Sequence, residues 1–294
     1  MRPHARPTLC TLAAVAALGV VQPPGVQPAH AQGAAKPSRI VSLDLCTDQL
    51  LIELAERERI AAVTHLAADP ALSAIPAKAK GILITHGAAE DVLRYDPDLI
   101  LAGPFGVSPT VGLLWRLKRN VVVVPLPANL NGVRTSIRTV ASAIGEELRG
   151  EAMITAFDRR LARLATKTNA ASPPTAVIYQ VGGAVSGTGS LADAVLTAAG
   201  FRNRAGEYPV ARNGQVPLEA LVASPPDLIV LSSTADEYRT AIADNLRHPV
   251  LLRLRQRTAS IELPWQLWLC GTPHIADAVE RLVAARAKIT ARSP

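Results

Sequence analysis

The chain has 294 residues, and its 31 lysines and arginines exceed its 24 acidic residues by a formal net charge of +7 at pH 7. The excess is scattered, as at Arg253, Arg255 and Arg257, and is not interleaved with aromatic residues, which argues against nucleic-acid binding. No stretch after residue 31 is long and apolar enough to be a transmembrane helix, so a soluble mature protein is expected.

The first 31 residues have the features of an export signal. Two arginines precede an apolar stretch, 9–21, that is too short to span a bilayer. The small-x-small sequence at 29–31 predicts cleavage there, so the mature chain is expected to begin at Gln32. Cys10 lies at the start of the apolar stretch rather than after it, which argues against lipidation. Removal of the signal 1–31 leaves a net charge of about +5 and enough chain for two lobes.

Short apolar strands alternate with helices in the next part of the chain, which indicates an α/β lobe with a largely parallel sheet. The expected strands are 39–43, 60–63, 99–102 and 121–124. Pro125 stops the last of them. A helix over 49–55 is expected after the first strand, with Thr47 or Asp48 as its cap. We assign residues 32–145 to this N-terminal lobe.

A proline-free stretch over about 135–168 has apolar residues at three- and four-residue spacing, which predicts helices. Gly145 and Gly150 are expected to divide it. The second helix, over about 150–167, would be roughly 27 Å long at 1.5 Å per residue. We assign residues 146–170 to a helix that connects two lobes.

The C-terminal lobe, 171–294, is expected to open with a strand at 176–179. A glycine-rich loop follows the strand, and Ser190 is expected to cap a helix over 191–199. The later elements are an αβ unit at 217–231, a strand at 261–264 and a final helix at 275–289.

One αβ unit occurs twice, at a constant offset of 129 residues: Glu90 and Asp98 of the first copy correspond to Glu219 and Asp227 of the second. In each copy a short helix leads into Pro-Asp and a buried strand. The offset is far longer than a solenoid period of roughly 20–50 residues, so it indicates two similar lobes. A cleft between matched lobes is where a ligand is expected.

This organisation resembles the periplasmic substrate-binding proteins of ABC importers for cobalamin, ferric siderophores and haem. The resemblance is carried by residues 39–43, by the repeated unit that starts at Glu90 and Glu219 and leads into Pro-Asp-Leu-Ile in both lobes, and by the stretch 265–274. It covers essentially the whole mature chain. It implies two similar α/β lobes with mostly parallel sheets joined by one long helix, with the ligand in a cleft between them.

In open α/β lobes, ligands meet the loops at the carboxyl ends of strands. The residues expected to touch the ligand are Asp44, Cys46, Thr47, His86 and Phe105 in the first lobe and Gln180, Gly182, Trp265 and Trp268 in the second. The two tryptophans offer stacking area to a macrocycle or a catecholate chelate, and relatives place aromatic residues in this segment. The alternative for both is that they pack in the core.

Cys46 and Cys270 are the only cysteines of the mature chain, and two alternatives are open for them. An even count in an oxidising compartment indicates a disulfide, which would tie the lobes together. Closing so long a loop contributes about 5 kcal/mol in the chain-entropy treatment. The other alternative is a pair of thiols that face the ligand and touch its metal.

Nothing local builds a site for a bare metal ion. No two histidines are three or four residues apart, and neither CxxC nor HExxH occurs. His86 is the one candidate for contact with a chelated metal. The chain has no Gly-x-Ser-x-Gly elbow and no phosphate loop, so we expect no enzyme activity and no cofactor.

The resemblance also implies that a surface acid on each lobe docks on the permease of the importer. Asp236 and Glu237 are the candidates in the second lobe. The corresponding loop of the first lobe, 103–109, has no acid. Either Glu90 or Asp91 replaces it there, or the docking chemistry differs.

The resemblance thus implies a periplasmic, monomeric protein that binds a metal chelate or macrocycle and delivers it to an ABC importer. A corrinoid such as cobalamin, or a ferric siderophore, is favoured over haem. Haem relatives commonly use a tyrosine ligand, and neither Tyr179 nor Tyr208 has a position that indicates this role. A receptor for haem or for a free divalent metal is the alternative. An exported enzyme on the same fold is a further, less favoured alternative.

Overall fold

The structure is a computed structural model. It describes residues 35–104, 109–165, 173–208, 214–231 and 244–291. The chain up to residue 35 forms a unit separate from residues 36–294, and the fold concerns the second unit alone. The signal predicted at 1–31 lies outside the described residues. Within them, no helix has both the length and the hydropathy needed to cross a membrane.

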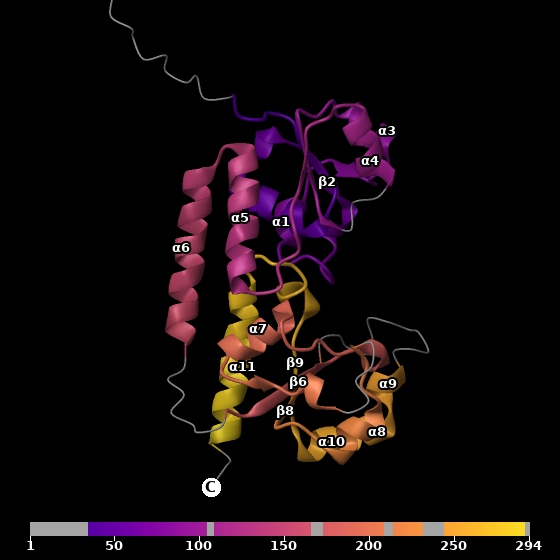
Figure 1. The fold of residues 1–294 in the computed structure, drawn as a ribbon, viewed down its shortest axis with the longest axis vertical. Helices are drawn as coiled ribbons and strands as arrows, with labels where there is room; N and C mark the ends of the chain where they lie inside the picture. Colours follow the sequence, from indigo (N-terminus) through magenta and orange to yellow (C-terminus); the bar gives the residue numbers. More distant parts are fainter. Residues whose placement is uncertain (1–34, 105–108, 166–172, 209–213, 232–243, 292–294) are drawn as a thin grey trace, which may run out of the picture. The chain divides into compact units, whose positions relative to one another are not determined.

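The N-terminal lobe is built on a five-stranded parallel sheet in the order β3-β2-β1-β4-β5 (Figure 1). Its strands are β1 (Ile40–Ser42), β2 (Ile60–Thr64), β3 (Ile84–Thr85), β4 (Leu99–Ala102) and β5 (Val121–Val123). All four predicted strands of this lobe are confirmed to within one residue at each end. The two-residue β3 has no counterpart in the sequence pattern.

Helices cover both faces of this sheet. They are α1 (Leu45–Leu54), α2 (Pro76–Ala79), α3 (Ala89–Arg94), α4 (Pro109–Arg116) and α5 (Leu130–Ile144). Leu99 and Leu101 of β4 belong to the core shared with α1 and α5. Ile100 between them packs with Val92 of α3 and Leu114 of α4. Alternate residues of one strand therefore enter opposite cores, as in parallel sheets that are buried on both faces.

Helix α1 begins earlier than predicted, and its cap is Asp44 rather than Thr47 or Asp48. The Asp44 carboxylate accepts the backbone N–H groups of Cys46 and Thr47. These bonds satisfy donors that the first turn of a helix leaves free. Asp48 instead is fully buried in α1 and accepts hydrogen bonds from the N–H and hydroxyl of Thr64 in β2. Burial raises the pKa of Asp48 to about 8.

Helix α6 (Glu147–Leu164) follows α5 and leads from the first lobe to the second (Figure 1). Gly145 separates the two helices, as predicted, with a φ of +72° that favours glycine. Gly150 was expected to be a second break, and this is wrong, because it lies inside α6. A Cβ there would come 2.5 Å from the Cβ of Ala141, so the absence of a side chain lets α5 and α6 pack closely.

The second lobe has a four-stranded parallel sheet in the order β7-β6-β8-β9. Its strands are β6 (Thr175–Tyr179), β7 (Arg202–Asn203), β8 (Leu228–Leu231) and β9 (Ala259–Glu262). Its helices are α7 (Leu191–Ala198), α8 (Leu218–Ala223), α9 (Asp244–Arg247), α10 (Pro249–Arg257) and α11 (Ile275–Thr290). The predicted Ser190 cap is confirmed, since its hydroxyl accepts the N–H of Asp193. The last strand begins and ends two residues earlier than predicted.

The repeated Pro-Asp has the same role in both lobes. Asp98 accepts hydrogen bonds from Ser38 and Arg39, just before β1, and Asp227 accepts two from Thr175, at the start of β6. Each carboxylate thereby fastens the first strand of its lobe to the neighbouring strand, β4 or β8. Burial opposes the ionisation of Asp98, but these hydrogen bonds hold its pKa below the usual value.

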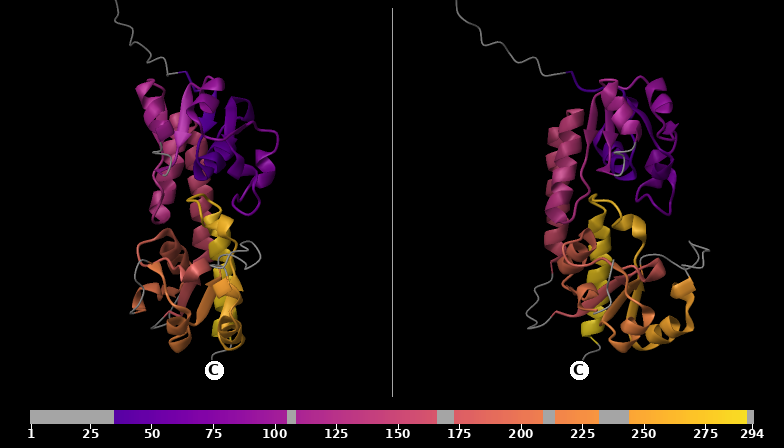
Figure 2. Two further views of the ribbon diagram at one scale, coloured as in Figure 1. Left: turned by 90° about the vertical axis from the view of Figure 1, so that its right-hand side faces the viewer. Right: turned by 45° about the vertical axis from the view of Figure 1, so that its right-hand side comes forward.

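The two lobes share one apolar core at their junction. The largest hydrophobic cluster contains side chains of α1, α5 and α6 together with those of α7 and α11. Helix α11 begins at the junction and runs through the second lobe (Figure 2). Arg160 of α6 forms ion pairs with Asp277 and Glu280 of α11. The C-terminal part of the connecting helix is therefore attached to the lobe that it leads into.

Candidate functional site

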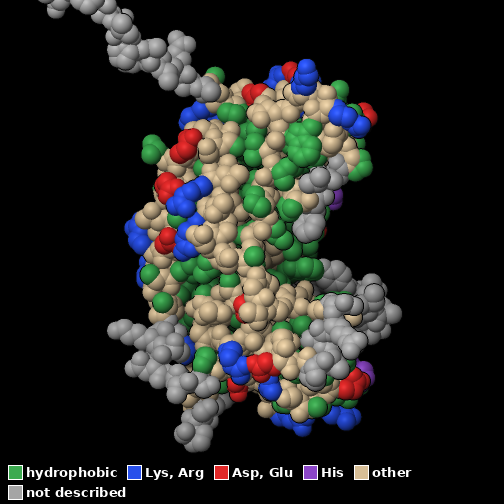
Figure 3. Space-filling view, viewed as in Figure 1, with side chains coloured by type: hydrophobic (Ala, Val, Ile, Leu, Met, Phe, Trp, Pro, Cys, Tyr) green, Lys and Arg blue, Asp and Glu red, His purple; other side chains and the backbone are tan. Residues whose placement is uncertain are grey.

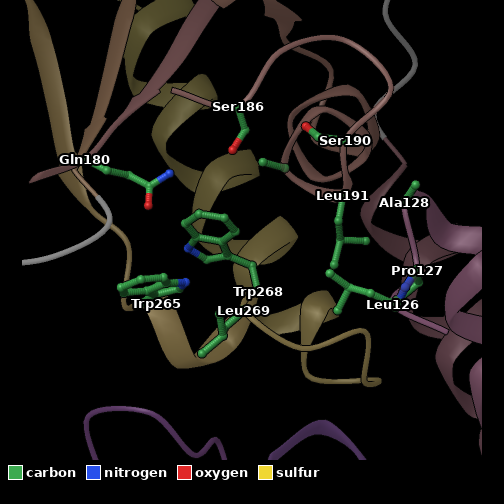
Figure 4. A pocket seen from close by; sticks show the side chains of 11 residues that line it. Leu126, Pro127, Ala128, Gln180, Ser186, Ser190, Leu191, Trp265, Trp268 and Leu269 are labelled. Atoms are coloured by element: carbon green, nitrogen blue, oxygen red, sulfur yellow. The ribbon is translucent and has the colours of Figure 1, made fainter. Parts of the chain in front are cut away.

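A cavity of about 380 Å³ lies between the lobes (Figure 4). Its lining comes from the loop after β5, from the loop after β6 with the start of α7, and from the segment after β9. The lining residues are Leu126, Pro127, Ala128, Gln180, Ser186, Ser190, Leu191, Ala192, Trp265, Trp268 and Leu269. These segments follow the carboxyl ends of strands, where open parallel sheets bind ligands. The volume is within the roughly 300–1,000 Å³ of small-molecule sites.

Two tryptophans form one wall of the cavity. The rings of Trp265 and Trp268 are stacked, with centroids 6.4 Å apart and planes inclined by 27°. Trp268 is only 7% exposed, so it packs in the shared core and also lines the cavity. Its indole N–H has no hydrogen-bond partner among the described residues. A buried donor without a partner costs about 1–3 kcal/mol.

The polar groups that line the cavity are uncharged. They are the amide of Gln180 and the hydroxyls of Ser186 and Ser190, and no lining residue in the described part of the chain carries a charge. Figure 4 shows Trp268 with Gln180 on one side and with Leu126 and Leu191 on the other. An apolar wall and neutral hydrogen-bonding groups suit a ligand that is itself neutral and polar at its edge.

Three residues that were expected to touch the ligand do not line this cavity. Asp44, Cys46 and Thr47 lie beside a cavity of only about 20 Å³, which also borders Pro127 and Gly271. Asp44 caps α1, and the Thr47 hydroxyl donates to the Asp44 carbonyl oxygen at 3.0 Å. The side chains of Asp44 and Thr47 therefore have structural roles at the start of α1.

His86 is exposed at the carboxyl end of β3, with its ring 5.7 Å from that of His65, and it does not line the cavity. Among the described residues, no three His, Cys, Asp or Glu side chains are grouped to hold a metal ion. The convergence of His86 with Cys46, Cys270 and His274, which a receptor for free metal requires, is thus not found in this part of the chain.

Of the remaining predicted residues, one is described by the structure and three are not. Gly182 lies in the turn after β6 with a φ of +72°, two residues beyond Gln180 but outside the cavity lining. Phe105, Asp236 and Glu237 lie outside the described residues.

Cys46 and Cys270 are joined by a disulfide bond, so of the two alternatives the structure contains the bond rather than free thiols. Their Cα atoms are 5.1 Å apart, and 224 positions separate them in the sequence. Cys46 is in the first turn of α1, whereas Cys270 directly follows Leu269 of the cavity wall. The bond therefore joins the two lobes beside the cavity.

A charged cluster also bridges the lobes. His274 at the start of α11 lies with Nε2 3.3 Å from Glu53 Oε1 of α1 and with Nδ1 3.4 Å from Asp277 Oδ2. The hydrogen bond to Glu53 is the main cause that raises the pKa of His274. Lys78 of α2 pairs with the same Glu53 oxygen at 2.9 Å. Protonated His274 thus lies between carboxylates of both lobes.

The surface around the junction is apolar by comparison with the rest. Figure 3 shows hydrophobic side chains gathered between the two lobes, whereas Lys, Arg, Asp and Glu lie mainly on the outer parts of the lobes and over α5 and α6.

The reasoning from sequence missed the wall that the first lobe contributes, residues 126–128. The signal was present, because a strand at 121–124 was expected and Pro125 was seen to stop it. The rule that ligands meet the carboxyl ends of strands applies to this strand as it does to the others.

The periplasmic binding protein family matches residues 40–255 of the chain. A cobalamin-binding protein of Halobacterium salinarum is 25% identical over 264 residues, which cover 86% of this chain and 69% of that protein.

Solved structures with the same fold include two periplasmic proteins. The haem-binding protein RhuT from Roseiflexus sp. RS-1, in apo form, has a TM-score of 0.67 at 22% identity over 86% of this chain and 98% of its own. The vitamin B12 binding protein BtuF of Vibrio cholerae has a TM-score of 0.65 at 18% identity over 87% and 98%. These likenesses show the two-lobed fold. The family match shows that the chain belongs to the periplasmic binding proteins, the extracytoplasmic, non-enzymatic solute receptors of ABC importers.

Proposed function

We propose that the protein captures a corrinoid such as cobalamin in the periplasm and, as a monomer, delivers it to an ABC importer. The observation that carries the proposal is the cavity with stacked Trp265 and Trp268 and an uncharged polar lining. A corrinoid is a broad macrocycle edged with neutral amides, which suits indole faces and amide or hydroxyl partners. The cobalamin-binding relative at 25% identity supports the same ligand class.

Haem fits the described lining less well. Its propionates call for a cation and its iron for an axial ligand, and the described lining residues supply neither. Tyr179 is 1% exposed within β6, and the Tyr208 hydroxyl donates to the carbonyl oxygen of Ser224 at 2.9 Å. Both phenols are therefore held inside the second lobe.

A ferric siderophore is the second candidate, because indole faces also stack on catecholate rings. Ferric catecholates carry net negative charge, and no cation among the described lining residues neutralises it. We therefore place corrinoids first.

The proposed protein has a signal, two lobes and a connecting segment. Residues 1–31 are the signal that directs the chain to the periplasm, and 32–145 and 171–294 are the lobes. Helix α6 falls inside the proposed connecting segment, 146–170.

Docking on the permease is assigned to acids at matched positions of the duplicated unit. Glu90 and Glu219 are exposed in the first turns of α3 and α8, and neither forms an ion pair with a described residue. Asp91, the other candidate in the first lobe, already accepts hydrogen bonds from three residues of its own lobe. Asp236 and Glu237 are kept as the alternative in the second lobe.

Calorimetric titration of the mature protein, 32–294, with cyanocobalamin, haemin and a ferric catecholate tests the ligand class. We expect cyanocobalamin to bind most tightly. Trp268→Ala should weaken this binding by about tenfold or more, because stacking and buried area are both lost. Trp115→Ala is the matched control, since Trp115 is 47% exposed on α4 outside the cavity. Tighter binding of haemin, or an unchanged affinity of folded Trp268→Ala, would refute the proposal.

A further inference from the structure

The tryptophan wall packs against the shared core, but few hydrogen bonds join it to the rest of the fold. The segment after β9 forms a short 3₁₀ turn, Trp265–Leu267, and its backbone hydrogen bonds run within the segment, from Trp268 and Leu269 back to the carbonyl oxygen of Trp265. Such a turn belongs to neither a sheet nor a long helix, so little of the regular fold fixes its position.

The side chains of this segment form few hydrogen bonds. Gln266 Nε2 donates to the carbonyl oxygen of Pro70 in the first lobe at 3.3 Å. By contrast, the Trp268 indole N–H, the Gln266 side-chain oxygen and the Thr272 hydroxyl have no hydrogen-bond partner among the described residues. Between Trp265 and Thr272, the Gln266 amide thus forms the one side-chain hydrogen bond to the first lobe found among the described residues, and His274 beyond them contacts Glu53.

The disulfide supplies the attachment that the hydrogen bonds lack. Cys270 comes one residue after Leu269 and two after Trp268, both of which line the cavity. Its partner Cys46 is fixed in the first turn of α1, where its N–H donates to the Asp44 carboxylate at 2.9 Å. The bond therefore fastens the tryptophan wall to the capped first turn of α1 in the first lobe.

The same bond sets the spacing of the two walls. Gly271, next to Cys270, lies so close to Pro127 that a Cβ on Gly271 would be 1.8 Å from Pro127 Cγ. Pro127 itself lines the cavity, as part of the wall over 126–128. The disulfide and this close contact hold the walls at one separation.

We infer that Cys46 and Cys270 are positioning residues of the ligand site: their disulfide holds the tryptophan wall against the wall at 126–128, so that the cavity is formed before the ligand arrives. Ordering the two indoles in advance removes a cost that binding would otherwise bear. Corrinoid affinity is then higher in the oxidised protein. The inference rests on the proposed function only in the choice of probe.

The test has one arm that needs no ligand. The chain has three tryptophans, so in a Trp115→Phe background both remaining ones lie in the wall. We expect acrylamide quenching of their fluorescence to rise when the folded protein is reduced with a phosphine, and to return on reoxidation. The double variant Cys46→Ser, Cys270→Ser should match the reduced protein. Its folding is checked by far-ultraviolet circular dichroism at low temperature.

A destabilised control variant shows whether quenching reports the position of the tryptophan wall or only the stability of the protein. Ile154→Ala removes a side chain that is 4% exposed in α6 and does not line the cavity, so it should lower the melting temperature without raising the quenching. In the second arm, cyanocobalamin should bind about tenfold more weakly to the reduced protein and to the double serine variant than to the oxidised protein.

The two arms fail in different ways. Absence of cyanocobalamin binding by the oxidised protein would refute the proposed ligand, while the quenching arm still decides on the wall. Equal quenching of the oxidised and reduced folded protein would overturn the inference, as would equal affinity in the two states.

Discussion

Gly271 offers a sharp test of the junction, because a single added methyl would enter occupied space. An alanine Cβ there would lie 1.8 Å from Pro127 Cγ, 2.8 Å from Cδ and 3.1 Å from Cβ. The backbone at Gly271 has no left-handed φ, so the effect of an alanine there comes from the steric clash alone and not from backbone strain. The pyrrolidine ring cannot rotate away, and one wall must move by about 1.5–2 Å to restore ordinary contact.

Overpacking of this kind costs about 1–3 kcal/mol, which lowers the Tm of a protein of this size by about 2–12 °C. The matched control is Gly187→Ala, where a Cβ would meet nothing within 4 Å. Pro127→Ala in the Gly271→Ala background should restore part of the loss, since only the atom at 3.1 Å remains. Calorimetric Tm values measure both effects. A Tm for Gly271→Ala equal to that of the control would refute the reasoning.

Three further predictions concern charge. Protonated His274 stabilises the junction at pH values below 6.5, the ordinary pKa of histidine, and this stabilisation is lost as pH rises through the raised pKa of the folded state. In urea unfolding measured across pH, His274→Gln should therefore lack this loss of stability. An unaltered pH profile in the variant would contradict the prediction. Asp48 keeps its proton when folded, so the free energy of unfolding should fall as pH rises from 3.8 to about 8. Asp48→Asn should make the free energy of unfolding less dependent on pH over this range. An unchanged dependence in the variant would count against the raised pKa of Asp48. Glu90→Arg and Glu219→Arg should reduce ligand uptake by vesicles that contain the importer but leave the ligand affinity measured by calorimetry unchanged. Glu58→Arg, also at an exposed position, is the control. Full uptake with the Glu90 and Glu219 variants would exclude this docking pair.

The parts of the fold that could be predicted are those with a strong local pattern. The strand at 99–102 is found as predicted, because a fully buried strand of a parallel sheet is a continuous apolar run between turn signals. The duplicated Pro-Asp pointed correctly to two lobes. Its purpose was not visible in the sequence, because the partners of Asp98 and Asp227 lie about 50 to 60 residues away along the chain.

The failures came from choices that depend on packing. Asp44 and Asp48 are both acceptable caps by type, and only the start of α1 decides between them. Gly150 looks like a helix break by propensity, yet contact with Ala141 overrides that preference. For Cys46 and Cys270 the sequence left a disulfide and free thiols both open, because the choice depends on how the lobes meet, and the structure contains the disulfide.

Of the candidate site, Gln180, Trp265 and Trp268 lie around the cavity as expected from the strand-end rule. The neutral character of the lining emerged only from the structure, because it depends on which loop residues face inward.

The claim that a corrinoid is the natural ligand is tested most directly by the absorbance spectrum of the protein purified from the periplasm of the cells that make it. Corrin bands that stay with the folded protein on gel filtration, and leave it on denaturation, are the predicted result. A Soret band or a ferric-catecholate band in their place would contradict it.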